Sequence, residues 1–348
     1  MLALLIVIVP GAGVYLLCRS RTNTDYQVKL DFRPPSTLIY NNSKAQVYAA
    51  CASADGQVFV FSTSLGELFI SRPPFDSAQL LEIAAGPAIH VTLSHDGRYL
   101  AYSSVTADLV VVFDIETHQR TSTFAVKGLG DLYHVSSFLF LPNDQGLLLS
   151  TLKGLLITVD RDGSNARIVF RHERMRGSLD IPGSINATAY VCHNKRIALN
   201  VGTDIVLVDA DSFREVHVLK QNGIHAMAAL DDRILVASDI NGKYHRWDCE
   251  TGQLVRVDSY GGLGMEVLGV SRDGALLAIT AAEFAHGPRS ISLVDVKSNK
   301  VIATWGMREA SIVGGGLLGK GEYVAVASSA GRVSIWRDVP ELREPKRK

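Results

Sequence analysis

Short stretches of alternating apolar and β-branched residues recur along the chain, and most of them end in an aspartate. Successive ends are 46, 49, 39, 47 and 42 residues apart. A repeat in the mid-forties is the length of a four-stranded blade of a β-propeller. The last residues of these stretches are Asp114, Asp160, Asp209, Asp248, Asp295 and, in place of an aspartate, Arg337.

A polar turn precedes most of these ends by about 18 residues, with short apolar runs on both sides of it. Residues 94–97 (Ser-His-Asp-Gly) and 271–274 (Ser-Arg-Asp-Gly) are the clearest examples, and residues 52–56 supply the same turn earlier in the chain. Asp-Gly pairs accept the positive φ angles of tight hairpins. Each turn is therefore predicted to link the innermost strand of a blade to the next strand.

The two signals together predict an all-β fold, because no stretch shows a sustained helical period. They divide the chain into seven blades at residues 44–86, 87–129, 130–177, 178–223, 224–262, 263–307 and 308–338. The propeller as a whole is predicted to span residues 27–338, and residues 339–348 form a basic tail.

The seventh blade runs out after three strands, at residues 332–336. An unpaired edge in an otherwise closed ring invites aggregation. Residues 27–32 read as an isolated strand before the first complete blade, so we predict that they pair with residues 332–336 and close the ring.

The N-terminal segment, residues 2–18, carries no charge and is barely long enough to span a bilayer as a helix. No basic residue precedes it and no small-residue cleavage site follows it. Residues 1–20 are therefore predicted to form an uncleaved anchor and not a secretory signal. Arg19 and Arg21 follow the segment. The positive-inside rule then predicts a single-pass membrane protein with its propeller in the cytoplasm, and the exported orientation stays open.

Two blades carry the repeat in its fullest form, at residues 237–248 and 327–336, and in both a tryptophan stands near the end. On these residues the chain resembles the WD-repeat β-propellers, while residues 292–306 are similar to the related YVTN-type repeats. The resemblance is a divergent one: Arg337 replaces the expected Asp, and the Gly-His pair of the family is missing from most blades. Trp247 and Trp336 are predicted to be packing residues, and the strand-end aspartates to be turn formers.

Charge and cysteine usage exclude several classes of function. The 35 Lys and Arg residues balance 35 Asp and Glu, so no overall basic field exists to hold a nucleic acid. Cys18, Cys51, Cys192 and Cys249 show no CxxC or Cys/His spacing, which argues against a zinc site. We predict no nucleic-acid partner and no cofactor.

The sequence contains no recognisable catalytic motif. No G-x-S-x-G elbow occurs, and the glycine-rich residues 314–320 lack the spacing and the hydroxyl of a phosphate-binding loop. These glycines are better explained by close packing of an inner strand. His90, His134 and His225 fall near the starts of inner strands, where three imidazoles could hold a metal, but their aligned positions differ.

We therefore predict a non-catalytic scaffold that binds a protein partner. The alternative is a lactonase-like or quinoprotein-like propeller that binds a small ligand or metal on its axis. Residues 171–184, which join the third and fourth blades, are the longest polar interruption. Arginine and methionine are enriched where proteins meet, so the predicted partner-binding residues are Arg171, Arg174, Met175 and Arg176.

Overall fold

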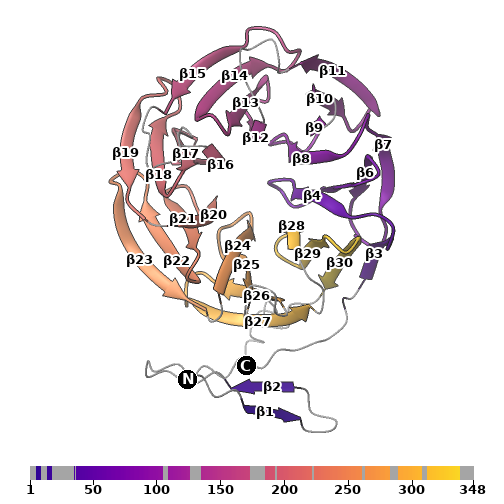
Figure 1. Cartoon of the computed structure of the whole chain (residues 1–348), viewed down its shortest axis with the longest axis vertical. Coiled ribbons are helices and arrows are strands. Elements are labelled where there is room, and N and C mark those ends of the chain that lie inside the picture. The colour runs from indigo at the N-terminus through magenta and orange to yellow at the C-terminus, as the bar shows by residue number, and fades with distance from the viewer. Residues whose placement is uncertain are drawn as a thin grey trace, which may run out of the picture.

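Seven four-stranded antiparallel sheets surround a common axis, with one strand of each sheet innermost (Figure 1). The computed structural model describes residues 5–8, 14–17, 35, 37–104, 109–125, 135–172, 185–192, 194–221, 223–260, 263–282, 289–307 and 312–337. Within these residues every regular element is a strand, and the predicted all-β, seven-bladed propeller is confirmed.

Six of the blades are continuous in sequence, and each is numbered here by its order in the chain. Blade 1 consists of β4 (Val47–Ala52), β5 (Phe59–Thr63), β6 (Glu67–Ser71) and β7 (Gln79–Ile83). Blade 2 consists of β8 (Ala88–Leu93), β9 (Tyr99–Ser104), β10 (Leu109–Asp114) and β11 (Gln119–Ala125). Blade 3 consists of β12 (Val135–Phe140), β13 (Gly146–Thr151), β14 (Leu155–Asp160) and β15 (Arg167–Arg171). Blades 4 to 6 consist of β16 (Ile185–Val191), β17 (Arg196–Val201), β18 (Asp204–Asp209) and β19 (Glu215–Leu219); β20 (Ile224–Ala229), β21 (Ile234–Asp239), β22 (Lys243–Asp248) and β23 (Gln253–Ser259); and β24 (Leu263–Val270), β25 (Leu276–Ala282), β26 (Arg289–Asp295) and β27 (Lys300–Met307).

The polar turns predicted from the sequence have the geometry that hairpins require. Gly97 has a φ of 72°, and the Asp96 carboxylate accepts hydrogen bonds from the Ser94 hydroxyl (2.6 Å) and the Arg98 backbone N–H (2.9 Å). Gly274 and Asp273 repeat this arrangement in blade 6. Asp-Gly is favoured here because the aspartate fixes the turn and glycine adopts positive φ without strain.

The strand-end aspartates are turn formers, as predicted. Asp114 accepts hydrogen bonds from the backbone N–H groups of Glu116 (2.9 Å) and Thr117 (3.1 Å), and its second oxygen accepts from the Arg98 guanidinium (2.8 Å). Asp248 does the same with the next turn and with Arg233. These carboxylates are occupied within their own hairpins.

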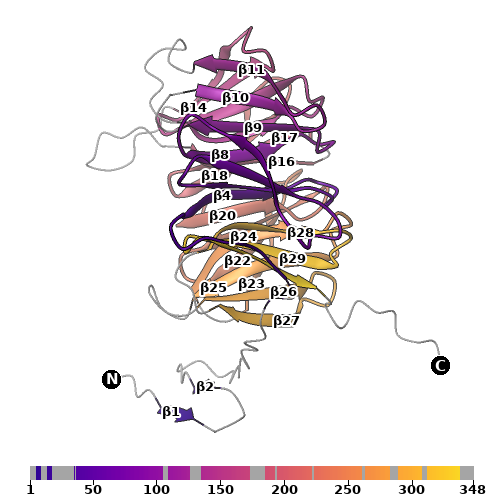
Figure 2. The ribbon, with the colours of Figure 1, turned by 90° about the vertical axis from the view of Figure 1, so that its right-hand side faces the viewer.

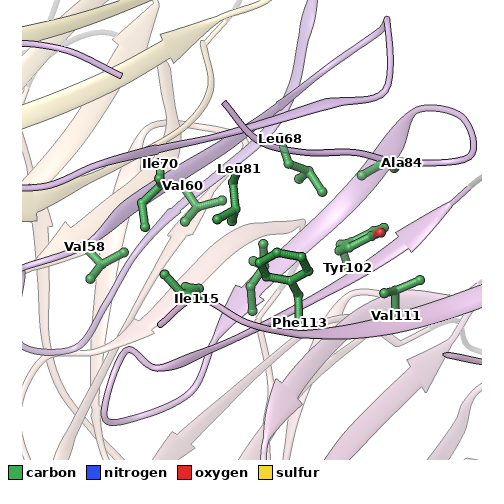
Figure 3. Close-up of a cluster of buried hydrophobic side chains, with 12 residues drawn as sticks. Val58, Val60, Leu68, Ile70, Leu81, Ala84, Tyr102, Val111, Phe113 and Ile115 are labelled. Atoms are coloured by element: carbon green, nitrogen blue, oxygen red, sulfur yellow. The ribbon is translucent and has the colours of Figure 1, made fainter. Parts of the chain in front are cut away.

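The apolar core lies between neighbouring blades. Figure 3 shows one such layer, in which Val60, Leu68 and Ile70 of blade 1 face Tyr102 and Phe113 of blade 2, all of them buried. Both faces of the middle strands are covered, which explains why β5, β10 and β14 are almost wholly buried. Burial of apolar surface is the main stabilising contribution in such a stack.

The seventh blade is completed by an N-terminal strand, although not by the predicted one. β3 (Thr37–Asn41) pairs antiparallel with β30 (Arg332–Arg337), after β28 (Ile312–Leu318) and β29 (Tyr323–Ser328). The prediction that residues 27–32 pair with residues 332–336 is therefore wrong, and residues 27–32 lie outside the described residues. The register is fixed by the turn that follows, where the Asn42 N–H donates to the Gly331 carbonyl at 2.9 Å.

Blades 7 and 1 approach each other closely through a glycine run on β28. A Cβ added at Gly314 would lie 2.7 Å from the Ala50 carbonyl oxygen, and one added at Gly316 would lie 2.6 Å from the Ala52 Cβ. The glycines within β28 serve close strand packing, as the sequence predicted, whereas Gly319 lies in the following turn with a φ of 63°.

A longer turn in blade 1 adds a second contact across this junction. It carries Phe75, which is 1% exposed and meets the Tyr323 ring of blade 7 edge-on at 5.3 Å. The Arg337 guanidinium at the end of β30 donates to the Pro74 carbonyl at 3.1 Å. The ring is thus joined by main-chain pairing, by glycine-mediated packing and by a buried aromatic side chain.

Within the predicted N-terminal anchor the structure describes two short strands, β1 (Leu5–Ile8) and β2 (Val14–Leu17), which pair antiparallel. The rest of residues 1–20 lies outside the described residues, and so does the basic tail. Among the residues that the structure describes, no helix is long and apolar enough to cross a membrane. The membrane-spanning helix stays a prediction.

Candidate interaction surface

The disc has two faces that are built from different connections (Figure 2). One face, here the hairpin face, carries the turns between the first and second and between the third and fourth strands of each blade. The opposite face, here the inter-blade face, carries the turns between second and third strands and the connections from one blade to the next. Every residue in a turn can be assigned to a face from the strand order alone.

The described turns of the hairpin face contain more acidic than basic residues and no large exposed apolar side chain. Its acidic turn residues are Asp55, Asp76, Asp96, Glu116, Asp144, Asp162, Asp211, Asp231, Asp232, Glu250, Asp273 and Glu322. Its basic turn residues are Arg72, Arg98, Arg161, Lys195, Arg214, Arg233, Arg272, Lys297 and Lys320.

A polar hollow of about 470 Å³ opens at the axis on the hairpin face. Turns of five blades line it, through Ala54, His95, Asn194, Asp231 and Arg272 among others. Hydrogen bonds from Ser271 and the Ala275 N–H lower the pKa of Asp273, so that carboxylate is committed to its own turn. A small-ligand function on the axis would use this hollow.

The inter-blade face has the opposite character. Large apolar side chains stand exposed at three of its described turns: Leu65 in blade 1 (54% exposed), Leu152 in blade 3 (41%) and Ile240 in blade 5 (60%). The described hairpin turns carry no such side chain, so the two faces differ in where they expose apolar side chains.

Side chains near the axis add to this surface. In all seven inner strands the pairing register shifts close to the inter-blade end, as at Val47/Ala49, Ala88/His90 and Ile224/Ala226. A bulge leaves one residue outside the ladder and re-aims its side chain. The residues at these three bulges, Tyr48, Ile89 and His225, are exposed.

The described turns and connections of the inter-blade face carry an excess of basic residues. They contain Lys44, Lys153 and Lys220, and within them there is no acidic residue. The strand ends beside them add Arg171, Lys243 and Arg332, against Glu67, Asp204 and Asp239. Within the described turns, the two faces therefore differ in the sign of their net charge.

Blades 3 to 5 hold most of these basic residues together with two of the exposed apolar turn residues, Leu152 and Ile240, which we call the apolar tips. We call this set the basic sector; its residues are Leu152, Lys153, Arg171, Lys220, Ile240 and Lys243. Sequence reasoning placed only Arg171 in it. The sequence analysis did not identify the other members, because it used the repeat only to locate strands. The same repeat also determines which turns lie on the same face of the disc.

The predicted partner-binding residues fall largely outside the described part of the chain. Arg171 is exposed at the end of β15, on the inter-blade face and within the basic sector. Arg174, Met175 and Arg176 belong to the segment between β15 and β16 and lie outside the described residues. Their role in partner binding stays a prediction.

The structure places two of the three candidate histidines apart. His90 on β8 meets the Phe138 ring edge-on at 6.2 Å, and burial lowers the pKa of His90. His225 is exposed on β20, across the ring from β8 (Figure 1), and His134 lies outside the described residues. The described residues contain no group of three His, Cys, Asp or Glu side chains that could hold a metal ion.

The two repeat tryptophans are packing residues, as predicted. Trp247 is 3% exposed and stacks on His245 at 5.4 Å, and Trp336 is 4% exposed and lies 6.1 Å from Trp305. His245 in turn contacts the buried Asp239 at 3.0 Å. The blade of residues 224–259 thus retains an Asp–His–Trp stack within one hairpin.

These observations define the chain as a seven-bladed, WD-repeat-like β-propeller. Among solved structures it is similar to a chain in a crystal structure of the mitotic checkpoint complex, with a TM-score of 0.68 and 16% sequence identity. The match covers 92% of this chain and 97% of that one, and at this identity it concerns the fold. No family model and no curated protein matches the chain in sequence.

Proposed function

We propose that this protein is a non-catalytic scaffold that binds a protein partner through its inter-blade face. The observation that carries the proposal is the contrast between the faces: exposed Leu65, Leu152 and Ile240 stand beside basic side chains on one, whereas the other is polar and rich in acids that serve their own turns. Proteins recognise each other through apolar anchors within a polar surround.

The proposal is tested by affinity capture with a matched pair of variants. We expect Leu152→Ser with Ile240→Ser to weaken partner capture by about 2 kcal/mol or more, because exposed anchors at a binding surface contribute on that scale. Leu254→Ser with Val257→Ser removes similarly exposed side chains (50% and 44%) from the rim strand β23 and serves as the control. Equal capture by both variants, each with an unchanged melting temperature, would refute the proposed surface.

The predicted contribution of Arg174 and Arg176 is measured in the same assay. Replacing both with alanine should also weaken capture by about 2 kcal/mol or more without lowering the melting temperature. Undiminished capture would remove that loop from the binding surface.

We further propose that residues 2–18 hold the chain on a membrane, with the propeller on the cytoplasmic side. The uncharged 2–18 segment and the following Arg19 and Arg21 support this. Protease added outside intact cells should leave the propeller uncut. Digestion of the propeller from outside would show that the orientation is the opposite of the proposed one. Release of the chain into the soluble fraction by alkaline carbonate would contradict the anchor itself.

A further inference from the structure

The basic sector presents its side chains on turns that are held rigidly. In blade 5 the Asp239 carboxylate accepts hydrogen bonds from the backbone N–H groups of Asn241 (2.8 Å) and Lys243 (2.9 Å). Its other oxygen contacts His245 at 3.0 Å. Burial would raise the pKa of Asp239, but these bonds outweigh it and hold that pKa below its usual value. The turn that carries Ile240 and Lys243 is therefore ordered before any partner arrives.

The connection between blades 4 and 5 packs against this turn. The Ile240 N–H donates to the Gly223 carbonyl at 3.0 Å, and a Cβ added at Gly223 would lie 3.0 Å from the Ile240 side chain. Gln221 reaches the Asp239 carboxylate at 3.5 Å. Lys220 directly precedes Gln221; its side chain is 59% exposed and lies 3.5 Å from the Asp204 carboxylate of blade 4.

Blade 3 repeats the arrangement with different residues. The His172 N–H donates to the Gly154 carbonyl at 2.9 Å, and Arg171 pairs with Leu155 in the sheet. The end of β15 therefore passes beside the turn that carries Leu152 and Lys153. Each of the two sites combines one exposed aliphatic side chain with at least two cationic ones.

The acidic groups of the sector compensate only part of this charge, because two carboxylates, Asp204 and Asp239, face four cationic side chains. Asp239 is buried and bonded to its turn, and Asp204 is 13% exposed and contacts Lys220 at 3.5 Å. On the hairpin face of the same blades the described turns carry six acidic residues and four basic ones: Asp144, Asp162, Asp211, Asp231, Asp232 and Glu250, with Arg161, Lys195, Arg214 and Arg233. A negatively charged partner is thus attracted to one face and repelled by the other.

From this charge complementarity we propose that the basic sector binds an acidic segment of a partner protein, anchored by aliphatic or aromatic side chains at Leu152 and Ile240. This inference rests on the proposed function, and it specifies the chemistry of the partner. Carboxylates of the segment pair with Lys220, Lys243 and Arg171, and its apolar side chains cover the two tips.

The test uses three fluorescein-labelled synthetic peptides and the full chain. The first peptide alternates glutamate with leucine and phenylalanine, the second replaces every glutamate with lysine, and the third replaces the apolar residues with serine. We expect the first peptide to bind at least about tenfold more tightly than either of the others, as measured by fluorescence anisotropy. Its affinity should fall as added salt screens the charges.

Two charge-reversal variants locate the effect. Lys220→Glu with Lys243→Glu should weaken binding of the acidic peptide by at least about tenfold. Lys195→Glu with Lys320→Glu changes the net charge equally on the hairpin face and should leave binding unchanged. Equal weakening in both variants, or equal binding of the lysine peptide to the unaltered chain, would overturn the inference.

The outcomes separate this inference from the proposed function. If the acidic peptide fails to bind while partner capture still depends on Leu152 and Ile240, the face is the binding surface but its partner is not acidic. If capture is also independent of both tips, the proposed function fails as well. Binding to phosphatidylserine vesicles that depends on Lys220 and Lys243, without peptide binding, would replace the protein segment by a membrane surface and overturn the inference.

Discussion

A chain that begins at residue 43 is expected to melt at least about 10 °C below one that begins at residue 35, by circular dichroism or calorimetry. The shorter chain lacks β3, so β30 loses its main-chain partner along Thr37–Asn41 and blade 7 keeps an open edge. The core contacts of Ile39 and Tyr40 with blades 7 and 1 are lost in addition.

The same pair of chains distinguishes the observed closing strand from the one the sequence suggested. A chain that begins at residue 35 lacks residues 27–32 and retains β3, so it should melt like the full-length protein. If it already shows the full loss of stability, the closing strand lies upstream and the observed pairing is incorrect.

Phe75→Ala is expected to lower the free energy of unfolding by about 3 to 5 kcal/mol, measured by urea denaturation. Phe75 is 1% exposed and packs against Tyr323 across the junction of blades 1 and 7, so its removal leaves a cavity where the two ends of the ring meet. Phe75→Leu retains most of the volume and serves as the control. A loss below about 1 kcal/mol for Phe75→Ala would show that the turn does not fasten the junction.

The blades could be predicted from the sequence because each one repeats the same local chemistry. Asp-Gly at residues 96–97 and 273–274 fixes a turn geometry that few other pairs adopt, and the strand-end aspartates mark the following hairpin. Where both markers occur within a period of about 45 residues, they locate the strands between them.

The closing strand could not be located in the same way. An outer strand is covered on one edge only, so its hydrophobic pattern is weak, and the sequence led to residues 27–32 instead of residues 37–41. Long-range contacts determine which segment pairs with β30. The Gly331 carbonyl accepts a hydrogen bond from the Asn42 N–H, and the ring centroid of Tyr40 lies 5.2 Å from that of Phe61 in blade 1. No local signal reports contacts between residues so far apart in the chain.

The interaction surface was partly within reach of the sequence. Once the blades are assigned, Leu152, Ile240 and Lys243 must share a face with Arg171, because the strands of each blade alternate in direction. What the sequence alone lacks is exposure: Asp239 is buried, whereas Ile240, the next residue, is 60% exposed.

Hydrogen exchange of the propeller with and without its captured partner tests the assignment of the binding surface most directly. The account predicts slower exchange in the partner complex at residues 151–154, 220–223 and 239–243 on the inter-blade face. The hairpin turns at residues 94–97, 230–233 and 271–274 should exchange at the same rate in both states. Protection of the hairpin turns, with the inter-blade turns unchanged, would contradict the account.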